Sequence, residues 1–394
     1  MSGRSTLTLM AGVVLLAACA MATGRSAVLV DNRNNAGTID DTPLTGAPFL
    51  LTPVADFDDP WAMAFIPQTA FALVTEKSGR LMLWESGGEV RELAGVPAVA
   101  YAGQGGLGDV ALDPDFGANR MVYLSWAEQG RGAQDATRGA VVGRARLSDD
   151  MTRLESLSVI WRQTPFVSGN GHFGHRIAFG PDGMLYISSG DRQKFDPAQD
   201  MGSNLGKIVR LNPDGSVPGD NPFAAQGGVA GQIWSLGHRN PLGMAFDPNG
   251  RLWELEMGPA GGDELNLVER GGNFGWPQAS NGDHYDGRDI ADHAPSDGFT
   301  APQLWWNPSI SPAALMIYSG DQFPNWRGNA FVAALSGSAL IRLGLDGETA
   351  RQLDRWNIGF RVRSVVQGSD GAIWLLGDGG NRGDGKLYRL TLRP

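Results

Sequence analysis

Apolar residues along this chain occur in short runs that glycine, proline, asparagine and aspartate interrupt. Four of these runs follow turns of one type, in which Asp or Asn and then Gly or Phe come shortly before β-branched and aromatic residues. These turns span residues 113–116, 180–183, 247–250 and 368–371, and residues 77–80 form a weaker copy. Short apolar runs bounded by such turn residues predict β-strands joined by tight turns.

The turns recur at a regular distance. Asp115 and Asp182 are 67 residues apart, as are Asp182 and Asn249. Asp370 follows Asp182 after 188 residues, close to three such steps. A regular internal period is typical of propellers and solenoids, whereas the alternative, a β-sandwich, predicts none. At about 55–65 residues per unit, residues 51–394 hold about six units. We therefore predict an all-β fold, a six-bladed β-propeller with four-stranded antiparallel blades.

The composition supports this fold and limits the function. The 394 residues include 56 glycines, 23 prolines and 12 tryptophans, which suits many short strands and turns better than long helices. The formal net charge is −10 and there is no basic stripe, so we expect no nucleic-acid partner. The single cysteine excludes internal disulfides and cysteine-ligated metals. No two histidines have the spacing of a helical zinc site, so zinc is not expected.

Residues 1–18 are typical of an export signal. A basic residue precedes an apolar run over residues 7–18, which is shorter than the roughly 20 residues that cross a bilayer. The run ends Leu-Ala-Ala-Cys19 and resembles a bacterial lipobox, although a plain signal peptide is the alternative. We expect an exported, periplasmic lipoprotein of a Gram-negative bacterium, attached to the membrane only through a lipid anchor at Cys19. Residues 19–50 are polar and suit a tether, and residues 51–394 form the propeller.

Five loops stand out because they are polar, rich in glycine and poor strand formers. They span residues 103–109, 169–176, 237–243, 256–277 and 360–363. Three of the five histidines of the chain lie in the second and third of these loops. A propeller alone does not define a function, so we expect the site where these loops meet.

These loops, in this order, resemble those of the soluble dehydrogenases for glucose and other aldoses that depend on pyrroloquinoline quinone (PQQ), a family of six-bladed propellers. The most specific motifs are Gly-His-Arg-Asn-Pro at 237–241 and Gly-Gly-Asn-Phe-Gly-Trp-Pro at 271–277, and the resemblance extends through most of residues 52–391. It implies oxidation of aldose sugars at the anomeric carbon to lactones, with PQQ and Ca²⁺ as cofactors. The expected partners are a small sugar substrate and an electron acceptor.

The resemblance assigns the role of catalytic base to His172. Removal of the anomeric hydroxyl proton while hydride leaves for the quinone needs a group that titrates near neutrality, which histidine provides. A base of this kind needs its other ring nitrogen held as a donor, and the resemblance does not identify the residue that holds it. Gln104 matches a residue that hydrogen-bonds the cofactor, and Asp191 matches an acidic residue that lines the sugar pocket. His175 is interpreted as structural.

Four further residues match cofactor ligands. Arg239 and Asn240 match residues that contact the quinone and carboxylate oxygens of PQQ. A guanidinium group suits the three carboxylates of PQQ and stabilises the negative charge that develops on the quinone, so Arg239 is also expected to act in catalysis. Arg361 and Arg363 stand two residues apart, so on an extended segment they point the same way and can form a second clamp. Without the resemblance, such arginines would be interpreted as structural ion pairs.

Calcium is expected at two places, both through oxygen ligands, which a hard cation requires. The resemblance places the calcium of the cofactor on the backbone carbonyls of Gly258 and Pro259. That ion would polarise the quinone carbonyl as a Lewis acid. A second, structural calcium is expected on the Glu264 carboxylate and the carbonyl of Phe274.

The chain departs from the family pattern at two positions. Ser336 stands where the family usually places a lysine against the cofactor, and Gly377 replaces a threonine before Asp378. Loss of a charged partner beside a tricarboxylate is expected to weaken cofactor binding by about 1–3 kcal/mol.

Two other functions remain open. A calcium-dependent propeller hydrolase, such as a lactonase, needs carboxylates that converge on the ion, whereas these loops offer arginines. A non-catalytic binding propeller needs no basic clamps beside His172. The dehydrogenase prediction requires that His172, Arg239 and Arg361 meet at one end of the ring. The resemblance places Trp305, Trp306 and Tyr318 near the expected sugar entrance, although most tryptophans in propellers belong to the core.

Overall fold

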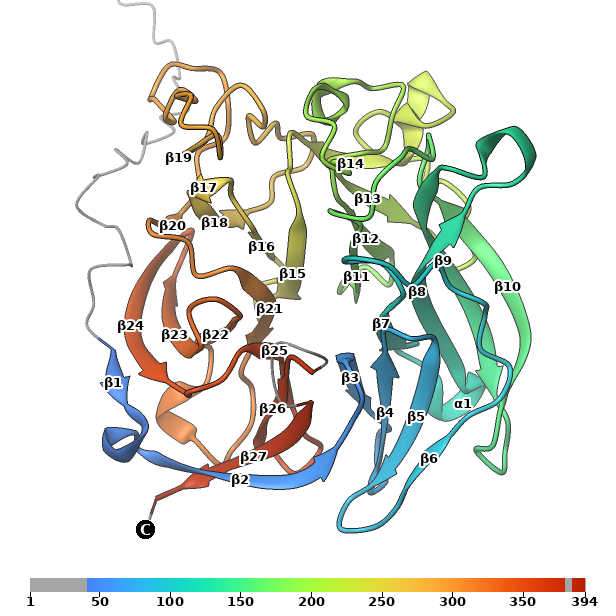
Figure 1. Cartoon of the computed structure of the whole chain (residues 1–394), viewed down its shortest axis with the longest axis vertical. Helices are drawn as coiled ribbons and strands as arrows, with labels where there is room; N and C mark the ends of the chain where they lie inside the picture. Colours follow the sequence, from blue (N-terminus) through green and yellow to red (C-terminus); the bar gives the residue numbers. More distant parts are fainter. Residues whose placement is uncertain (1–40, 380–384, 394) are drawn as a thin grey trace, which may run out of the picture.

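The computed structural model describes residues 41–379 and 385–393 and shows six β-sheets set as blades around a central axis (Figure 1). Neighbouring strands of each blade pair antiparallel. The innermost strands of successive blades contact one another around a closed ring. The predicted six-bladed β-propeller is therefore confirmed.

The blades follow the order of the chain, and the first strand of each lies innermost. Blades 1 to 3 consist of β3 (Pro60–Phe65), β4 (Phe71–Glu76), β5 (Arg80–Glu85) and β6 (Val90–Glu92); β7 (Leu107–Leu112), β8 (Met121–Gln129), β9 (Arg138–Leu147) and β10 (Leu154–Arg162); and β11 (Gly174–Phe179), β12 (Leu185–Ser189), β13 (Lys207–Leu211) and β14 (Ile233–Leu236). Blades 4 to 6 consist of β15 (Pro241–Phe246), β16 (Leu252–Glu256), β18 (Asp263–Leu267) and β20 (Leu304–Trp306); β21 (Pro312–Ile317), β22 (Ala330–Ala334), β23 (Ala339–Asp346) and β24 (Thr349–Asn357); and β25 (Val362–Gln367), β26 (Ile373–Gly377), β27 (Lys386–Leu392) and β2 (Phe49–Asp56).

The remaining elements are short. Strand β1 (Thr42–Pro43) runs parallel to β24, and β17 (Ala260–Gly261) pairs with β19 (Gly282–Asp283). The helical segments are α1 (Phe116–Asn119) and the 3₁₀ turns η2 (Leu44–Gly46), η3 (Gly132–Gln134), η4 (Asp196–Gln199), η5 (Ala224–Gln226), η6 (Ala230–Gln232) and η7 (Pro324–Trp326). No helix in the described part of the chain is long and apolar enough to span a bilayer.

Six clusters of buried apolar side chains fill the six interfaces between neighbouring blades. Between blades 1 and 2, for example, Leu73 and Leu83 share a cluster with Leu124 and Val141. Because each blade is covered on both faces, its middle strands are buried along their whole length, as in β12 and β16. This explains why the sequence shows continuous apolar runs rather than an alternation of apolar and polar residues.

The four strong turn motifs each join the innermost strand of a blade to its second strand, in blades 2, 3, 4 and 6. In blade 3, Asp182 Oδ1 accepts the backbone N–H of Met184 at 3.1 Å, and Gly183 between them has φ of 74°, which glycine adopts at little cost. Asp370 and Gly371, with φ of 78°, repeat this arrangement in blade 6. The 67-residue distance in the sequence is therefore one blade with its connections.

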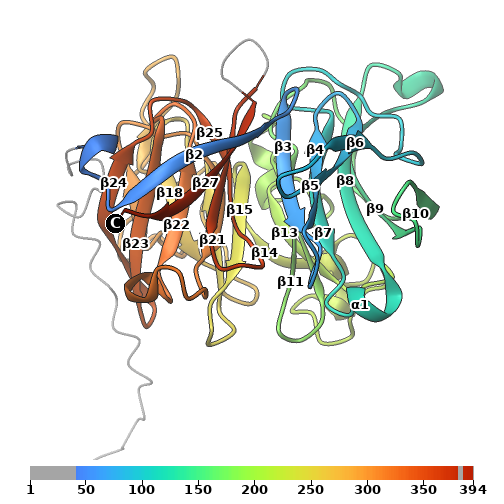
Figure 2. The same cartoon turned by 90° about the horizontal axis from the view of Figure 1, so that it is seen from below.

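Successive loops of an antiparallel blade alternate between the two ends of the ring, and Figure 2 shows strands running between these two ends. The four strong turns lie at one end. At the other, which we call the site end, lie the loops from second to third strands and those from one blade to the next. They include residues 93–106, 163–173, 237–240, 257–262 and 358–361. Residues 77–80, the weaker copy, join the second and third strands of blade 1, β4 and β5, and therefore lie at the site end. A Ser-Gly turn indicates a hairpin but does not specify which pair of strands it joins.

Strand β2 completes blade 6 by pairing with β27, so distant parts of the chain meet in one sheet (Figure 1). Phe49 of this strand is fully buried, with its ring 5.1 Å from that of Trp356. Blade 6 therefore includes residues before 51, the position at which the sequence placed the start of the propeller. The burial of Phe49 and the pairing of Thr42 with β24 both depend on residues that are far away in the sequence. The predicted signal peptide and Cys19 lie outside the described residues.

We expect Phe49→Ala to lower the free energy of unfolding by about 3–5 kcal/mol, because it removes a fully buried aromatic ring from the strand that closes the ring. Leu50→Ala, at the next position of the same strand and 40 % exposed, is the matched control and should change it by less than about 0.5 kcal/mol. Urea unfolding of both variants measures the difference. Equal effects of the two substitutions would contradict a closure that depends on Phe49.

Candidate active site

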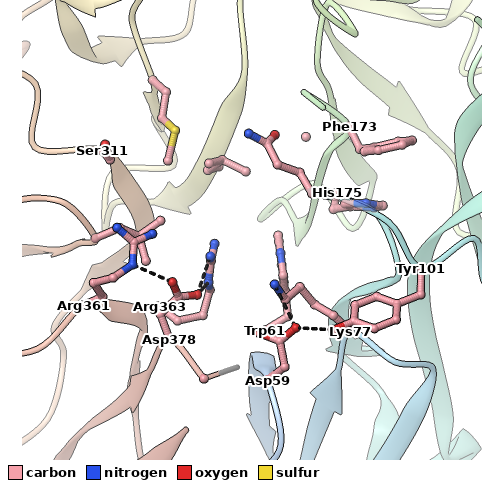
Figure 3. A pocket seen from close by; sticks show the side chains of 17 residues that line it. Asp59, Trp61, Lys77, Tyr101, Phe173, His175, Ser311, Arg361, Arg363 and Asp378 are labelled. Carbon is pink, nitrogen blue, oxygen red and sulfur yellow. Dashed lines mark hydrogen bonds and ion pairs between the residues drawn. The ribbon is translucent and has the colours of Figure 1, made fainter. Parts of the chain in front are cut away.

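Two cavities at the site end are lined by several of the predicted residues. The larger, of about 720 Å³, is lined by Gln104, Arg361 and Arg363 (Figure 3). The smaller, of about 250 Å³, is lined by His172 and Arg239. The two are linked because the backbone N–H of His172 donates to Oε1 of Gln104 at 2.7 Å. The groups on which the dehydrogenase prediction depends thus lie at one end of the ring.

His172 and Asp191 form a buried pair, and their exposed fractions are 6 % and 0 %. Nδ1 of His172 lies 2.7 Å from Oδ1 of Asp191. The second oxygen, Oδ2, accepts the indole N–H of Trp276 at 2.8 Å, and Oδ1 also accepts the backbone N–H of Gln193. Asp191 is therefore the residue that holds the imidazole. It borders the smaller cavity as expected, but both of its oxygens are engaged by protein groups, so the structure gives it a positioning role rather than direct contact with the cofactor.

The electrostatics of this pair favour a neutral histidine. Burial lowers the pKa of His172, and the charge of Arg239 also lowers it, against the opposite effect of the hydrogen bond to Asp191. Burial opposes ionisation of Asp191, but the hydrogen bond from His172 and the charge of Arg239 keep its pKa below the usual value. At neutral pH, Nδ1–H therefore donates to an ionised carboxylate. Nε2 keeps a free lone pair, which a general base requires.

Arg239 and Asn240 precede β15, and their backbone N–H groups donate to Oε2 of Glu256 at 2.5 and 3.1 Å. The Arg239 guanidinium donates through Nη1 to the carbonyl of Gly258 at 2.6 Å and lies over the ring of Trp276. Its Nε and both polar atoms of the Asn240 amide are buried without hydrogen-bond partners. Buried polar groups are normally paired, so these atoms indicate a missing polar partner.

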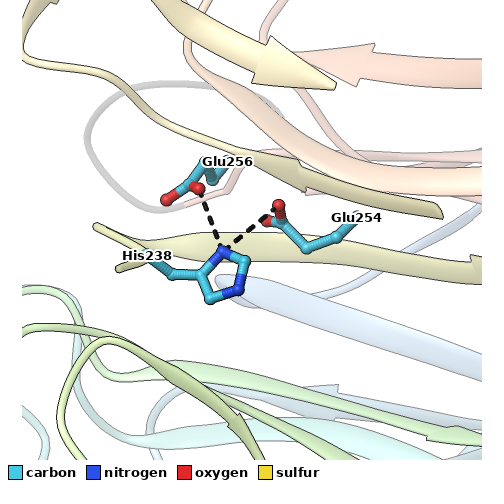
Figure 4. Close-up of side chains that lie close together, drawn as sticks. All are labelled: His238, Glu254 and Glu256. Atoms are coloured by element: carbon cyan, nitrogen blue, oxygen red, sulfur yellow. Dashed lines mark hydrogen bonds and ion pairs between the residues drawn. The ribbon is translucent and has the colours of Figure 1, made fainter. Parts of the chain in front are cut away.

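Glu256 is held in turn by a buried cluster, shown in Figure 4. Nδ1 of His238 lies 3.2 Å from Oε1 of Glu256 and 3.7 Å from Oε2 of Glu254. Burial and the charge of Glu256 raise the pKa of Glu254 well above its usual value. The cluster fixes the segment that carries Arg239. His238 therefore supports the site indirectly, through Glu256.

Arg361 and Arg363 converge on one carboxylate that the sequence did not assign a role. Nε of Arg361 donates to Oδ2 of Asp378 at 2.7 Å, and Nη2 of Arg363 donates to Oδ1 at 2.6 Å. Asp378 is 4 % exposed; burial opposes its ionisation, but the charge of Arg363 and the hydrogen bond from Arg361 keep its pKa below the usual value. The two arginines thus form one rigid cationic wall of the larger cavity (Figure 3).

The loop between β16 and β18 is suited to the expected calcium of the cofactor. Gly258 lacks space for a side chain, because a Cβ there would lie 2.3 Å from the carbonyl oxygen of Gly261 and 2.2 Å from that of Gly262. Several carbonyl groups therefore crowd together, and Pro259 adds a carbonyl without an N–H. The Gly258 carbonyl accepts one hydrogen bond from Arg239 and keeps a second lone pair, so these residues fit the ion.

The second expected calcium site is also consistent with its donors. Glu264 and Phe274 line a small cavity of about 10 Å³ next to Glu256, close to the size of one water molecule. Burial and the charge of Glu256 raise the pKa of Glu264 well above the usual value. A cation would offset this concentration of buried carboxylates, and carboxylate and carbonyl oxygens are ligands that calcium prefers.

The two departures from the family pattern leave little polar character in their places. Oγ of Ser336 donates to Oγ of Ser311 at 2.7 Å and does not reach across the cavity as a lysine would. Gly377 ends β26 opposite Val362 and adds no hydroxyl group.

Several residues of the site were not identified from the sequence. Phe195, Trp276 and Tyr285 give the smaller cavity an aromatic wall, and Phe195 stacks on Trp276 with ring centroids 5.6 Å apart. Trp306 and Tyr318, which the sequence placed near the sugar entrance, are fully buried core residues. The exposed fraction of Tyr285, 78 %, is the kind of signal that only the structure supplies.

His175 lines the larger cavity, and both of its ring nitrogens are buried without hydrogen-bond partners, so its structural interpretation stays a prediction. Burial lowers its pKa to about 3, and its ring stacks on Phe173 with centroids 5.3 Å apart.

Taken together, the cationic wall, the unpaired amide of Asn240 and the carbonyl loop fit an anionic, oxygen-rich group such as PQQ.

The comparisons with known proteins agree with this geometry. The model of the glucose / sorbosone dehydrogenase family matches residues 57–389. A curated relative, the aldose sugar dehydrogenase YliI of Escherichia coli (strain K12), is 38 % identical over 342 residues, which cover 85 % of this chain and 91 % of the relative.

Solved structures show the same likeness. The soluble aldose sugar dehydrogenase from Escherichia coli in the apo-form has a TM-score of 0.82 at 37 % identity, over 88 % of this chain and 100 % of that chain. The PQQ-bound form of an aldose sugar dehydrogenase from Streptomyces coelicolor has a TM-score of 0.70 at 27 % identity, over 88 % and 100 %. The extent of these matches shows that the chain belongs to the glucose and sorbosone dehydrogenase family.

Proposed function

We propose that this protein oxidises aldose sugars at the anomeric carbon to lactones, with PQQ and Ca²⁺ as cofactors. The observation that supports it most directly is the His172–Asp191 pair, which places a neutral imidazole at a cavity that arginines also line. The PQQ-bound relative and the aldose sugar dehydrogenase relative support the choice of cofactor and substrate class.

His172 acts as the general base. Its Nε2 takes the proton of the anomeric hydroxyl while the hydrogen on the anomeric carbon leaves, so that a carbonyl forms in the sugar ring. Asp191 fixes the tautomer and stabilises the imidazolium that results, because its carboxylate lies 2.7 Å from Nδ1. PQQ, when bound, accepts the two electrons and the hydrogen that leave the sugar.

Arg239 contributes electrostatic stabilisation. Arg239 is 6 % exposed and its guanidinium is held by backbone carbonyls, so its charge is largely shielded from bulk water. Asn240 and Gln104 provide amide groups toward the quinone, and Arg361 and Arg363 attract its carboxylates. Calcium would be held by the carbonyls of the β16–β18 loop and would withdraw electron density from the quinone.

The aromatic wall suits a sugar ring. Phe195 and Tyr285 border the cavity that contains His172, and their ring faces offer apolar surface to the C–H groups of a sugar, while Arg288 and Asp286 supply polar partners at the rim. This composition, an apolar wall with a few polar groups, is typical of small-molecule sites.

A calcium-dependent hydrolase is less consistent with the site. Asp59 and Asp378 are the carboxylates that line the larger cavity among the described residues, and each is paired with cationic side chains rather than open to an ion. For the N-terminal region, we propose export and acylation at Cys19 on the sequence pattern alone.

Addition of PQQ and Ca²⁺ to the purified apo-protein should give aldose-dependent bleaching of a redox dye. His172→Ala should retain PQQ after desalting but lower kcat by about 10²–10⁴-fold, because the base is lost while the cationic groups remain. Absence of bleaching with every aldose tested, together with no cofactor absorbance after desalting, would exclude the proposed function. Wild-type rates in His172→Ala would exclude only the role of His172.

The pH dependence should reflect the lowered pKa of His172. Since the histidine stays neutral until the pH falls below its usual pKa of about 6.5, kcat/KM should remain constant from pH 7.5 through 6.5 and decline only at lower pH. Asp191→Asn should lower kcat across this range because the tautomer is no longer fixed. A rate profile of wild type whose acid limb is centred at or above pH 6.5 would contradict this assignment.

Removal of calcium should destabilise the protein. At a free calcium concentration 100-fold above Kd, binding contributes about 2.7 kcal/mol, so EGTA should lower Tm by several degrees and added Ca²⁺ should restore it. In Glu264→Gln the difference in Tm between calcium and EGTA should shrink, whereas in Glu89→Gln, at an exposed position, it should persist. A wild-type Tm that does not respond to EGTA argues against a structural calcium.

A further inference from the structure

Lys77 is a cationic residue of the larger cavity to which the proposed function gives no role. It lies in the loop between β4 and β5, at the site end, and its side chain is 15 % exposed. Nζ lies 3.0 Å from Oδ2 of Asp59, and the same oxygen accepts the hydroxyl of Tyr101 at 2.8 Å. Figure 3 shows this group beside the arginine clamp formed by Arg361 and Arg363.

The backbone of Lys77 is fixed from both sides. Its N–H donates to the carbonyl of Asp59 at 3.0 Å, and its carbonyl accepts the N–H of Leu107 at 3.1 Å. Gly106 makes this approach possible, because a Cβ at that position would lie 2.1 Å from the Lys77 carbonyl oxygen. The ammonium group is therefore delivered to the cavity by a rigid loop, as expected of a binding residue.

The segments that carry Lys77 and the arginine clamp are in direct contact. Gly379, the residue after Asp378, packs so closely on Asp59 that a Cβ there would lie 2.6 Å from the Asp59 backbone nitrogen. The charged side chains that line the cavity among the described residues are three cations, Lys77 with the two arginines, and two carboxylates, Asp59 and Asp378. Three minus two leaves one positive charge for an anionic ligand.

The donors of Lys77 are not exhausted. An ammonium group has three N–H bonds, and Asp59 is the one ion-pair partner of Lys77 in the described part of the chain. We propose that Lys77 binds a carboxylate of the cofactor while it remains paired with Asp59. This inference rests on the proposed function, and it supplies from blade 1 a cation that Ser336 in blade 5 does not provide.

A purely structural role for Lys77, as the counter-ion of Asp59, makes a different prediction. If Lys77 served only Asp59, loss of either partner would disturb the loop in the same way. If Lys77 binds the cofactor, Lys77→Met removes a cation and Asp59→Asn removes an anion beside the ligand. The two substitutions should then change the affinity for PQQ in opposite directions.

The experiment is a titration of the purified full-length apo-protein with PQQ in the presence of Ca²⁺, followed by quenching of tryptophan fluorescence. We expect Lys77→Met to raise the Kd about ten- to hundredfold and Asp59→Asn to leave it unchanged or lower it. Lys194→Met is the matched control, because Lys194 lies outside this cavity and bonds Ser168; its Kd should equal that of wild type.

The double variant Lys77→Met/Asp59→Asn protects the test against misfolding, because it leaves no unpaired Asp59 charge in the loop. It should bind PQQ about tenfold or more weakly than Asp59→Asn alone. An equal Kd for these two proteins overturns the inference, as does a Kd that rises equally in both single variants. If wild type itself binds no PQQ, the proposed function fails first, which distinguishes that result from a failure of Lys77 alone.

Discussion

The alternation of loops in an antiparallel blade is the constraint on which this site depends. Because each blade has four strands, the loop that leaves its last strand and the loop between its second and third strands reach the same end of the ring. His172, Arg239 and Arg361 all lie in connections between blades, and Lys77 and Gly258 lie in loops between second and third strands. Residues almost 300 positions apart in the sequence thus meet without any blade departing from the common pattern.

The chemistry of the site depends on how its buried charged groups pair with one another. Asp191 orients His172, which burial and the charge of Arg239 keep neutral. Asp378 holds two arginines together, and Glu256 holds the backbone of Arg239 through its own carboxylate. Each anion is paired with groups that leave donors or a lone pair free toward the cavities. Fixed, partly satisfied charges of this kind need little reorganisation when an anionic ligand binds, which is the basis of electrostatic preorganisation.

Much of the fold could be predicted from the sequence because each blade is formed mainly by segments that are close together in the chain. The distance from Asp182 to Asn249, and the two-residue spacing of Arg361 and Arg363, follow from strand and turn geometry within a few tens of residues. The partner of His172, the closing strand at Phe49 and the place of Lys77 in the same cavity as Asp378 could not be predicted in this way. Each depends on contacts between residues that only the closed ring brings together.

The closure of blade 6 also constrains how the protein is made. Strand β2 is among the first parts of the described chain and β27 among the last, so the sheet they share joins the two ends of the described propeller. A ribosome must have synthesised the chain through Leu392 before that sheet can be complete, and the loop entropy of the intervening residues must then be overcome. Until the sixth blade forms, the first and fifth blades each leave one apolar face uncovered, and the arginine clamp joins the rest of the site only when that blade fills the gap.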